Sequence, residues 1–182
     1  LTLSAGIGIY HDSYPISAIA AEVAEMEDVS KDMPGKNAVT LLADGTYHTI
    51  TVSGKPLKVK DGTCSWTDFE KRVLEDKLAH IRTFFDFSPD RGKAFLYHLL
   101  ALIRNQEERI NFARYIYLLS RMEPDEKAEP REKETYRVFS KKMVQWITEE
   151  QDRAELKMAI TLYAYLTRNN REDADSENHY EQ

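Results

Sequence analysis

The hydrophobic pattern of this chain changes its period at one point, near Asp61 and Gly62. Before that point, short apolar runs typical of β-strands surround one stretch of helical period. After it, apolar residues recur every three or four positions through most of the remaining sequence. Because the two periods belong to different secondary structures, we predict an α+β fold in two parts, residues 1–62 and residues 63–182.

The first part predicts a strand, a helix and a second strand. Residues 1–10 are almost wholly apolar or small, which is typical of a strand covered on both faces. Residues 16–31 have apolar side chains at helical spacing, which predicts an amphipathic helix that Pro34-Gly35 ends. Residues 38–42 are a second apolar strand. The first part is therefore expected to be a βαβ unit.

A polar, half-exposed segment follows this unit. Asp44-Gly45 is typical of a hairpin turn, and residues 47–52 alternate between apolar and polar side chains. Gly54-Lys55-Pro56 then interrupts the pattern. We expect one half-exposed strand here and a boundary at Asp61-Gly62.

The second part predicts a bundle of about five helices. Ser65 or Thr67 can cap the first helix. Glu123 to Arg131 is charged and contains two prolines, which favours an exposed loop. Residues from about 171 to 182 are acidic and polar, so we expect a disordered tail. The apolar positions place the helices at about residues 67–85, 95–102, 110–119, 136–147 and 156–163.

Composition excludes several classes of protein. Hydrophobic residues make up 42% and charged residues 31%, which is ordinary for a globular protein. No apolar run approaches the roughly 20 residues that span a bilayer, so a cytoplasmic location is expected. The net charge of −6 requires any nucleic-acid contact to be local. The single cysteine, Cys64, can form neither an internal disulfide nor a paired zinc site.

The first forty residues carry a family resemblance. The run Leu1-Thr-Leu-Ser-Ala-Gly-Ile-Gly-Ile-Tyr10, followed by Tyr14-Pro15-Ile16-Ser17 and an Ala/Glu-rich helix, resembles the large subunit of type III CRISPR effector complexes. The same order of elements, with Ser30-Lys31 and Gly35-Lys36-Asn37, also resembles diguanylate cyclases. The Tyr-Pro before the helix and the long helical part favour the CRISPR subunit. The last helix, with Leu162, Tyr163, Tyr165 and Arg168, is most similar to the Csm type, subtype III-A.

The resemblance implies a larger parent protein. Such a parent would have an HD domain that cleaves single-stranded DNA, two ferredoxin-like, GGDEF-like palms that make cyclic oligoadenylates from ATP with Mg²⁺ or Mn²⁺, and a helical C-terminal domain. This chain would be its C-terminal fragment, helping to form the ATP pocket and docking the small Csm subunits on the CRISPR RNA and target RNA. Metal-dependent nucleotidyl transfer needs carboxylates on the metal, and the family's Gly-Gly-Asp-Asp does not occur in this sequence. We therefore expect no cyclisation and no bound cofactor with this fragment alone.

Three residues are candidates for nucleotide binding. Lys31 aligns with the lysine that reaches the triphosphate in related cyclases, although it could equally favour the negative end of its helix. Ser4 and Gly6 lie in the strand that the family places near the nucleotide. Small residues there let either a ligand or another backbone approach, and packing is the favoured interpretation.

The helical part offers candidates for contact with RNA or a partner protein. Lys141, Lys142, Arg109 and Arg114 could meet a phosphate backbone or an acidic surface, or could belong to solvated helix faces. Aromatic residues at helical spacing could stack on bases, but bundle core is the favoured interpretation. They are Tyr115/Tyr117, Phe84/Phe85 and Tyr163/Tyr165.

Two other functions remain open at this point. The chain could be the end of a diguanylate cyclase with a helical sensor, which an upstream Gly-Gly-Asp/Glu-Glu-Phe would support. It could also be a non-catalytic adaptor module. The doubly buried first strand expected above argues against the adaptor, because an isolated adaptor would expose both faces of that strand.

Overall fold

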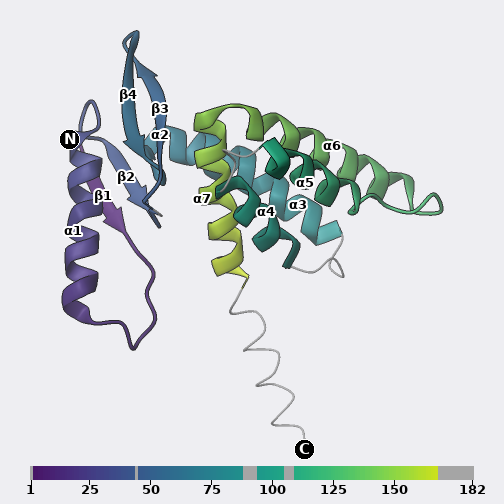
Figure 1. Cartoon of the computed structure of the whole chain (residues 1–182), viewed down its shortest axis with the longest axis horizontal. Helices are drawn as coiled ribbons and strands as arrows, with labels where there is room; N and C mark the ends of the chain where they lie inside the picture. Colours follow the sequence, from purple (N-terminus) through teal and green to yellow (C-terminus); the bar gives the residue numbers. More distant parts are fainter. Residues whose placement is uncertain (1, 44, 88–93, 105–108, 168–182) are drawn as a thin grey trace, which may run out of the picture. The chain divides into compact units, whose positions relative to one another are not determined.

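The computed structural model describes residues 2–43, 45–87, 94–104 and 109–167 (Figure 1). The chain forms two compact units. Unit 1 consists of Leu1–Lys77 and Gln145–Met158, and unit 2 consists of Leu78–Val144 and Ala159–Gln182. Residues 63–77 and 145–158, grouped with the helical part above, therefore belong to the unit that contains the strands. The predicted domain bounds, 1–62 and 63–182, stay a prediction.

The βαβ unit predicted from the sequence is confirmed. Strand β1 (Ser4–Ile7) leads through helix α1 (Ile16–Asp32) to strand β2 (Ala38–Leu41). The two strands pair in parallel, with Ser4 opposite Ala38 and Ile7 opposite Leu41. Helix α1 packs against both strands (Figure 1). A helical crossover is the usual connection between parallel neighbours in a sheet.

Strand β2 is the centre of this sheet, and β1 is at its edge. Strand β5 (Thr63–Ser65) pairs antiparallel with β2, which gives the order β1-β2-β5. Every residue of β2 is buried, whereas Ile7 of β1 is 42% exposed and Leu3 is 62% exposed. The prediction that the first strand is covered on both faces is therefore wrong for the described part of the chain, because α1 covers one face and little covers the other.

A separate hairpin follows the βαβ unit. Strands β3 (Tyr47–Val52) and β4 (Lys55–Lys60) pair antiparallel around Ser53 and Gly54. Both turn residues have positive φ, 50° and 77°, as a two-residue turn matched to the twist of the strands requires. The half-exposed strand at 47–52 is confirmed. Strands β4 and β5 were not predicted, because Pro56 and three lysines obscure the first and only three residues form the second.

The first predicted helix is three consecutive segments. Ser65 is the N-cap that precedes helix α2 (Trp66–Asp68). Its hydroxyl accepts a hydrogen bond from the Asp68 backbone N–H at 3.0 Å. A π-helix, η1 (Phe69–Leu78), follows and continues into α3 (Ala79–Phe87). The predicted Ser65 cap is thus confirmed. The wide turns of η1 were not predicted, since the apolar spacing of a short π-helical stretch resembles that of an α-helix.

The remaining helices are α4 (Ala94–Arg104), α5 (Arg109–Ser120), α6 (Pro130–Thr148) and α7 (Glu150–Leu166). The core of unit 2 is aromatic: the Phe84 ring stacks on Phe139 at 4.0 Å, and Phe85 lies 5.4 Å from Tyr163. The predicted loop before α6 is confirmed up to Pro130, which is the first residue of the helix. The expected tail at 171–182 lies outside the described residues. In the described ranges, no helix is long and apolar enough to span a membrane.

Candidate functional site

Lys31 lies in the last turn of α1, as expected. Its Nζ is 2.9 Å from Glu27 Oε1 and 3.5 Å from Asp28 Oδ1, and its side chain is 47% exposed. The hydrogen bond with Glu27 is the main cause of the raised pKa of Lys31. Such an exposed pair is easily exchanged. The ammonium group is therefore charged and accessible, and either carboxylate can be replaced by another anion.

Ser4 and Gly6 of β1 lie on the face of the sheet that packs against α1. The Ser4 hydroxyl donates to the backbone oxygens of Lys36, at 3.1 Å, and of Ser30, at 3.4 Å. A Cβ on Gly6 would lie 2.6 Å from both the Glu27 nitrogen and the Val23 oxygen. Gly6 is thus required for the close approach of α1 to β1. Contact of Ser4, Gly6 and Lys31 with a nucleotide stays a prediction.

Hydroxyl groups join α1 to the sheet just before Lys31. Ser30 Oγ donates to the Ala5 carbonyl at 2.7 Å and is 2.7 Å from Thr40 Oγ1, which is 2.9 Å from Thr63 Oγ1. Ser30, Thr40 and Thr63 are all buried. These contacts give the serine that precedes Lys31 a structural role. They also fix the end of α1 that carries Lys31 against β1 and β2.

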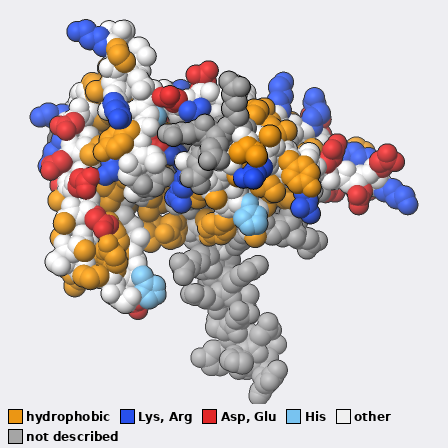
Figure 2. All heavy atoms as spheres, viewed as in Figure 1, with side chains coloured by type: hydrophobic (Ala, Val, Ile, Leu, Met, Phe, Trp, Pro, Cys, Tyr) orange, Lys and Arg blue, Asp and Glu red, His pale blue; other side chains and the backbone are white. Residues whose placement is uncertain are grey.

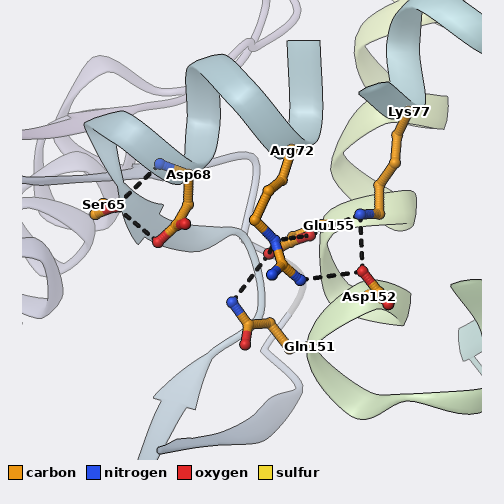
Figure 3. Close-up of polar contacts among 7 residues, drawn as sticks. All are labelled: Ser65, Asp68, Arg72, Lys77, Gln151, Asp152 and Glu155. Atoms are coloured by element: carbon orange, nitrogen blue, oxygen red, sulfur yellow. Dashed lines mark hydrogen bonds and ion pairs between the residues drawn. The ribbon is translucent and has the colours of Figure 1, made fainter. Parts of the chain in front are cut away.

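Four charged side chains form a network between η1 and α7, in which Lys77 and Glu155 are buried while Arg72 is 40% exposed (Figure 3). Lys77 Nζ lies 2.7 Å from Glu155 Oε2 and 2.9 Å from Asp152 Oδ1. Arg72 bonds the same two carboxylates at 2.8 Å and 3.0 Å. The sequence reasoning missed this network. One signal was available, because Lys77 lies four residues after Val73 and four before Ile81, on the buried face of the helix.

A second polar cluster joins the hairpin to α7. His48 Nδ1 is 2.7 Å from Asp61 Oδ1, while Thr46 donates to Asp61 Oδ2 at 2.6 Å and Lys157 bonds the same oxygen. Burial alone would raise the pKa of Asp61, but hydrogen bonds from His48, Lys157 and Thr46 outweigh it, so the pKa is lowered. Asp61 is therefore a buried, ionised anchor.

Neither cluster has the features of a catalytic centre. The cavity between them is about 20 Å³, room for about one water molecule and too small for a substrate. The Cys64 thiol lines this cavity, but burial raises its pKa to about 12, so it is protonated and a poor nucleophile at neutral pH. In the part of the chain that the structure describes, no three His, Cys, Asp or Glu residues are placed to hold a metal ion. Both clusters join segments of unit 1 that lie far apart in the sequence.

The candidate basic residues come from two helices. Lys141 is exposed and Lys142 half-buried on α6, and Arg114 is exposed on α5, with its Nη1 3.4 Å from Asn111 Oδ1. Arg109 begins α5, and its side chain lies outside the described residues. Bundle core is confirmed for four of the six aromatic residues, since Phe84, Phe85, Tyr115 and Tyr163 are buried. Tyr117 is 62% exposed.

Two family models match the chain. Residues 1–40 match the second palm domain of Cas10/Cmr2, and residues 82–169 match the second helical domain of the Cmr2 subunit of the CRISPR RNA silencing complex. The first match covers β1, α1 and the start of β2. The second covers most of α3 and the helices that follow, up to the end of the described residues.

Curated relatives agree with these models. The chain is 37% identical over 169 residues to a subtype III-A Cas10/Csm1 of Mycobacterium tuberculosis, described as a CRISPR system single-strand-specific deoxyribonuclease. It is 36% identical over 171 residues to the protein of the same description from Streptococcus thermophilus. Each match covers 92% of this chain but only 18% and 20% of the relatives' length. These findings favour the CRISPR large subunit over a diguanylate cyclase. The chain belongs to the Cas10/Csm1 family of type III-A large subunits and corresponds to one part of such a subunit.

Proposed function

We propose that this chain completes a cyclase-like palm in a type III-A effector large subunit and carries its C-terminal helical domain. The observation that carries this proposal is the open edge of β1. Within the described residues β1 pairs only with β2, and Leu3, Ile7 and Ile9 are 62%, 42% and 46% exposed. Further strands of the parent protein would pair with the open edge of β1, and elements packed on the open face of the sheet would cover these side chains, which would give the ferredoxin-like, GGDEF-like palm that the resemblance implies.

In the assembled palm, Lys31 contacts the phosphates of ATP. Two observations support this assignment: the accessible Lys31 ammonium group at the end of α1, and the hydroxyl contacts of Ser30 that hold this end in place. A phosphate would displace Glu27 and Asp28 and form a charge-assisted hydrogen bond. As the resemblance implies, Mg²⁺ or Mn²⁺ would be held by the aspartates of the family's Gly-Gly-Asp-Asp motif, which does not occur in this chain.

The parent protein acts inside an RNA-guided complex in the cytoplasm. The relatives' description as single-strand-specific deoxyribonucleases supports a nuclease function elsewhere in the parent. We assign cyclic oligoadenylate synthesis to the palms and docking of the small Csm subunits to the helical domain. Through these subunits, the helical domain would be coupled to the CRISPR RNA and the target RNA.

A lysine substitution in the assembled complex tests the nucleotide assignment. Lys31→Ala should raise the KM for ATP in oligoadenylate synthesis by about tenfold, because a charge-assisted phosphate contact is lost. Lys55→Ala, at an exposed lysine of the hairpin, is the matched control and should leave the KM unchanged. An unchanged KM in Lys31→Ala would remove Lys31 from the nucleotide site.

A further inference from the structure

Helices α4 and α5 contain no acidic residue. Residues 94–104 and 109–122 include no Asp or Glu, although the whole chain has a net charge of −6. The same two segments contain one histidine, His98, and four arginines, which are Arg104, Arg109, Arg114 and Arg121. Glu107 and Glu108 lie between the helices, outside the described residues. These two segments are therefore locally basic stretches of an acidic chain.

The same helices expose large aromatic and apolar side chains. Tyr97 is 54% exposed, Tyr117 62%, Ile110 52% and Phe112 40%. Single exposed apolar residues are normal, but four on two contacting helices are a concentration. In Figure 2, hydrophobic, basic and histidine side chains lie together over α4 and α5, and acidic side chains gather farther out, toward the loop before α6.

The spacing places these side chains, except Phe112, in one stripe along each of the two helices. On α5, Ile110, Arg114 and Tyr117 follow each other at four and three residues, so they share one face, and Arg121 follows Tyr117 by four residues in the turn just after the helix. Arg114 therefore lies one turn before the exposed Tyr117 ring on α5, and Arg121 follows this ring just beyond the end of the helix. On α4, Tyr97 is seven residues before Arg104, which is the same face two turns later.

Rings and guanidinium groups in alternation fit one class of ligand. Base stacking on exposed aromatic faces requires unpaired bases, and arginines one turn away can contact the phosphates that link them. A duplex offers the phosphates without the base faces. An acidic protein surface could also pair with the arginines, and the displacement experiment below distinguishes it from a nucleic acid. We propose that five exposed side chains, here called the Tyr-Arg face, bind single-stranded nucleic acid: Tyr97, Arg104, Arg114, Tyr117 and Arg121. This goes beyond the palm assignment and does not depend on it.

Fluorescence anisotropy of the whole 182-residue chain with labelled 20-nucleotide single strands, RNA in one series and DNA in another, tests the proposal. The double variant Tyr97→Ala/Tyr117→Ala should raise the Kd at least tenfold, since two stacking contacts are lost. Tyr97→Phe/Tyr117→Phe should restore binding, because phenylalanine keeps the ring. Arg114→Gln/Arg121→Gln should reduce the slope of log K against log salt by about one to one and a half. The tighter of the two strands identifies the source of the ligand.

The chain supplies matched controls. Tyr47 on β3 is 54% exposed, like Tyr97, and Lys55 and Lys58 on β4 are exposed cations. Tyr47→Ala and Lys55→Gln/Lys58→Gln should leave the Kd unchanged, and circular dichroism confirms that each variant folds. Three results would overturn the proposal: no binding by the unmodified chain at low salt, equal losses in the control variants, or displacement of the strand by polyglutamate as readily as by unlabelled RNA. The last result would assign the Tyr-Arg face to an acidic protein partner.

Discussion

The Lys77 ammonium lies 2.7 Å from Glu155 Oε2, and the two side chains are only 1% and 3% exposed. Asp152 also bonds this ammonium, and the Trp146 ring lies 5.4 Å from it. The pair joins a π-helical segment to a helix 78 residues later in the chain. A buried charge is tolerated only when its partners are in place, so this contact holds η1 and α7 in one arrangement within unit 1.

Lys77→Met should destabilise unit 1 strongly. The substitution keeps the length of the side chain but leaves two carboxylates with one cation, Arg72, and the loss of one member of a buried pair costs about 3 kcal/mol. Urea unfolding of the 182-residue chain measures the change. Arg137→Ala, which breaks an exposed pair with Glu134, is the control and should have little effect. Equal stability of the two variants would show that the buried network contributes no more than a surface pair.

Asp61→Asn should lower stability in a way that depends on pH. The pKa of Asp61 is lowered in the folded protein, so its stabilising effect is present above the unfolded pKa, about 4, and is lost as pH falls through the folded value. The free energies of unfolding of the wild type and the variant should differ by about 3 kcal/mol at neutral pH. That difference should shrink at acidic pH. A constant difference across the pH range would contradict the assignment of Asp61 as an ionised anchor.

Gly6→Ala should destabilise the βαβ unit by about 2 kcal/mol, because its Cβ would overlap backbone atoms of α1. Gly35→Ala is the comparison, since Gly35 has φ of 85° with open space around its Cβ and should cost about 1 kcal/mol through backbone strain alone. Thermal unfolding followed by circular dichroism ranks the two. A smaller effect at Gly6 than at Gly35 would mean that α1 can move away from β1 at little cost.

Cys64 should resist alkylation in the folded chain. Its thiol is buried, and its pKa is raised to about 12, so the reactive thiolate is scarce at neutral pH. Iodoacetamide followed by intact-mass measurement should show no adduct in native buffer and one adduct in urea. Rapid labelling of the native chain would show that the cavity around Cys64 opens readily.

The local elements could largely be predicted from the sequence. The apolar runs at 1–10 and 38–42 with an amphipathic stretch between them indicated the βαβ unit, and Ser65 indicated a helix start. The resemblance of the first forty residues to type III large subunits is confirmed by the family models and relatives. Such signals lie within a few residues of one another, so a single sequence contains them.

The tertiary contacts could not be predicted in the same way. Asp61 and Lys157 are 96 residues apart, and nothing in either segment identifies the other. The position of Lys77 on an apolar helix face could have indicated a buried charge, but not which carboxylates it meets. The exposure of β1 was mispredicted because an apolar strand indicates that cover exists, not that it comes from the same stretch of chain.

Amide hydrogen exchange of β1 tests the central claim most directly, since we assign this strand to the interior of a larger palm sheet. The exchange of residues 4–7 should be compared in the 182-residue chain and in the full-length large subunit, with the buried strand β2 as the internal reference. The account predicts that β1 exchanges at least tenfold more slowly in the full-length protein, where a further strand pairs with its open edge, while β2 is well protected in both. Equal exchange of β1 in the two proteins would contradict the proposal that the palm continues beyond β1.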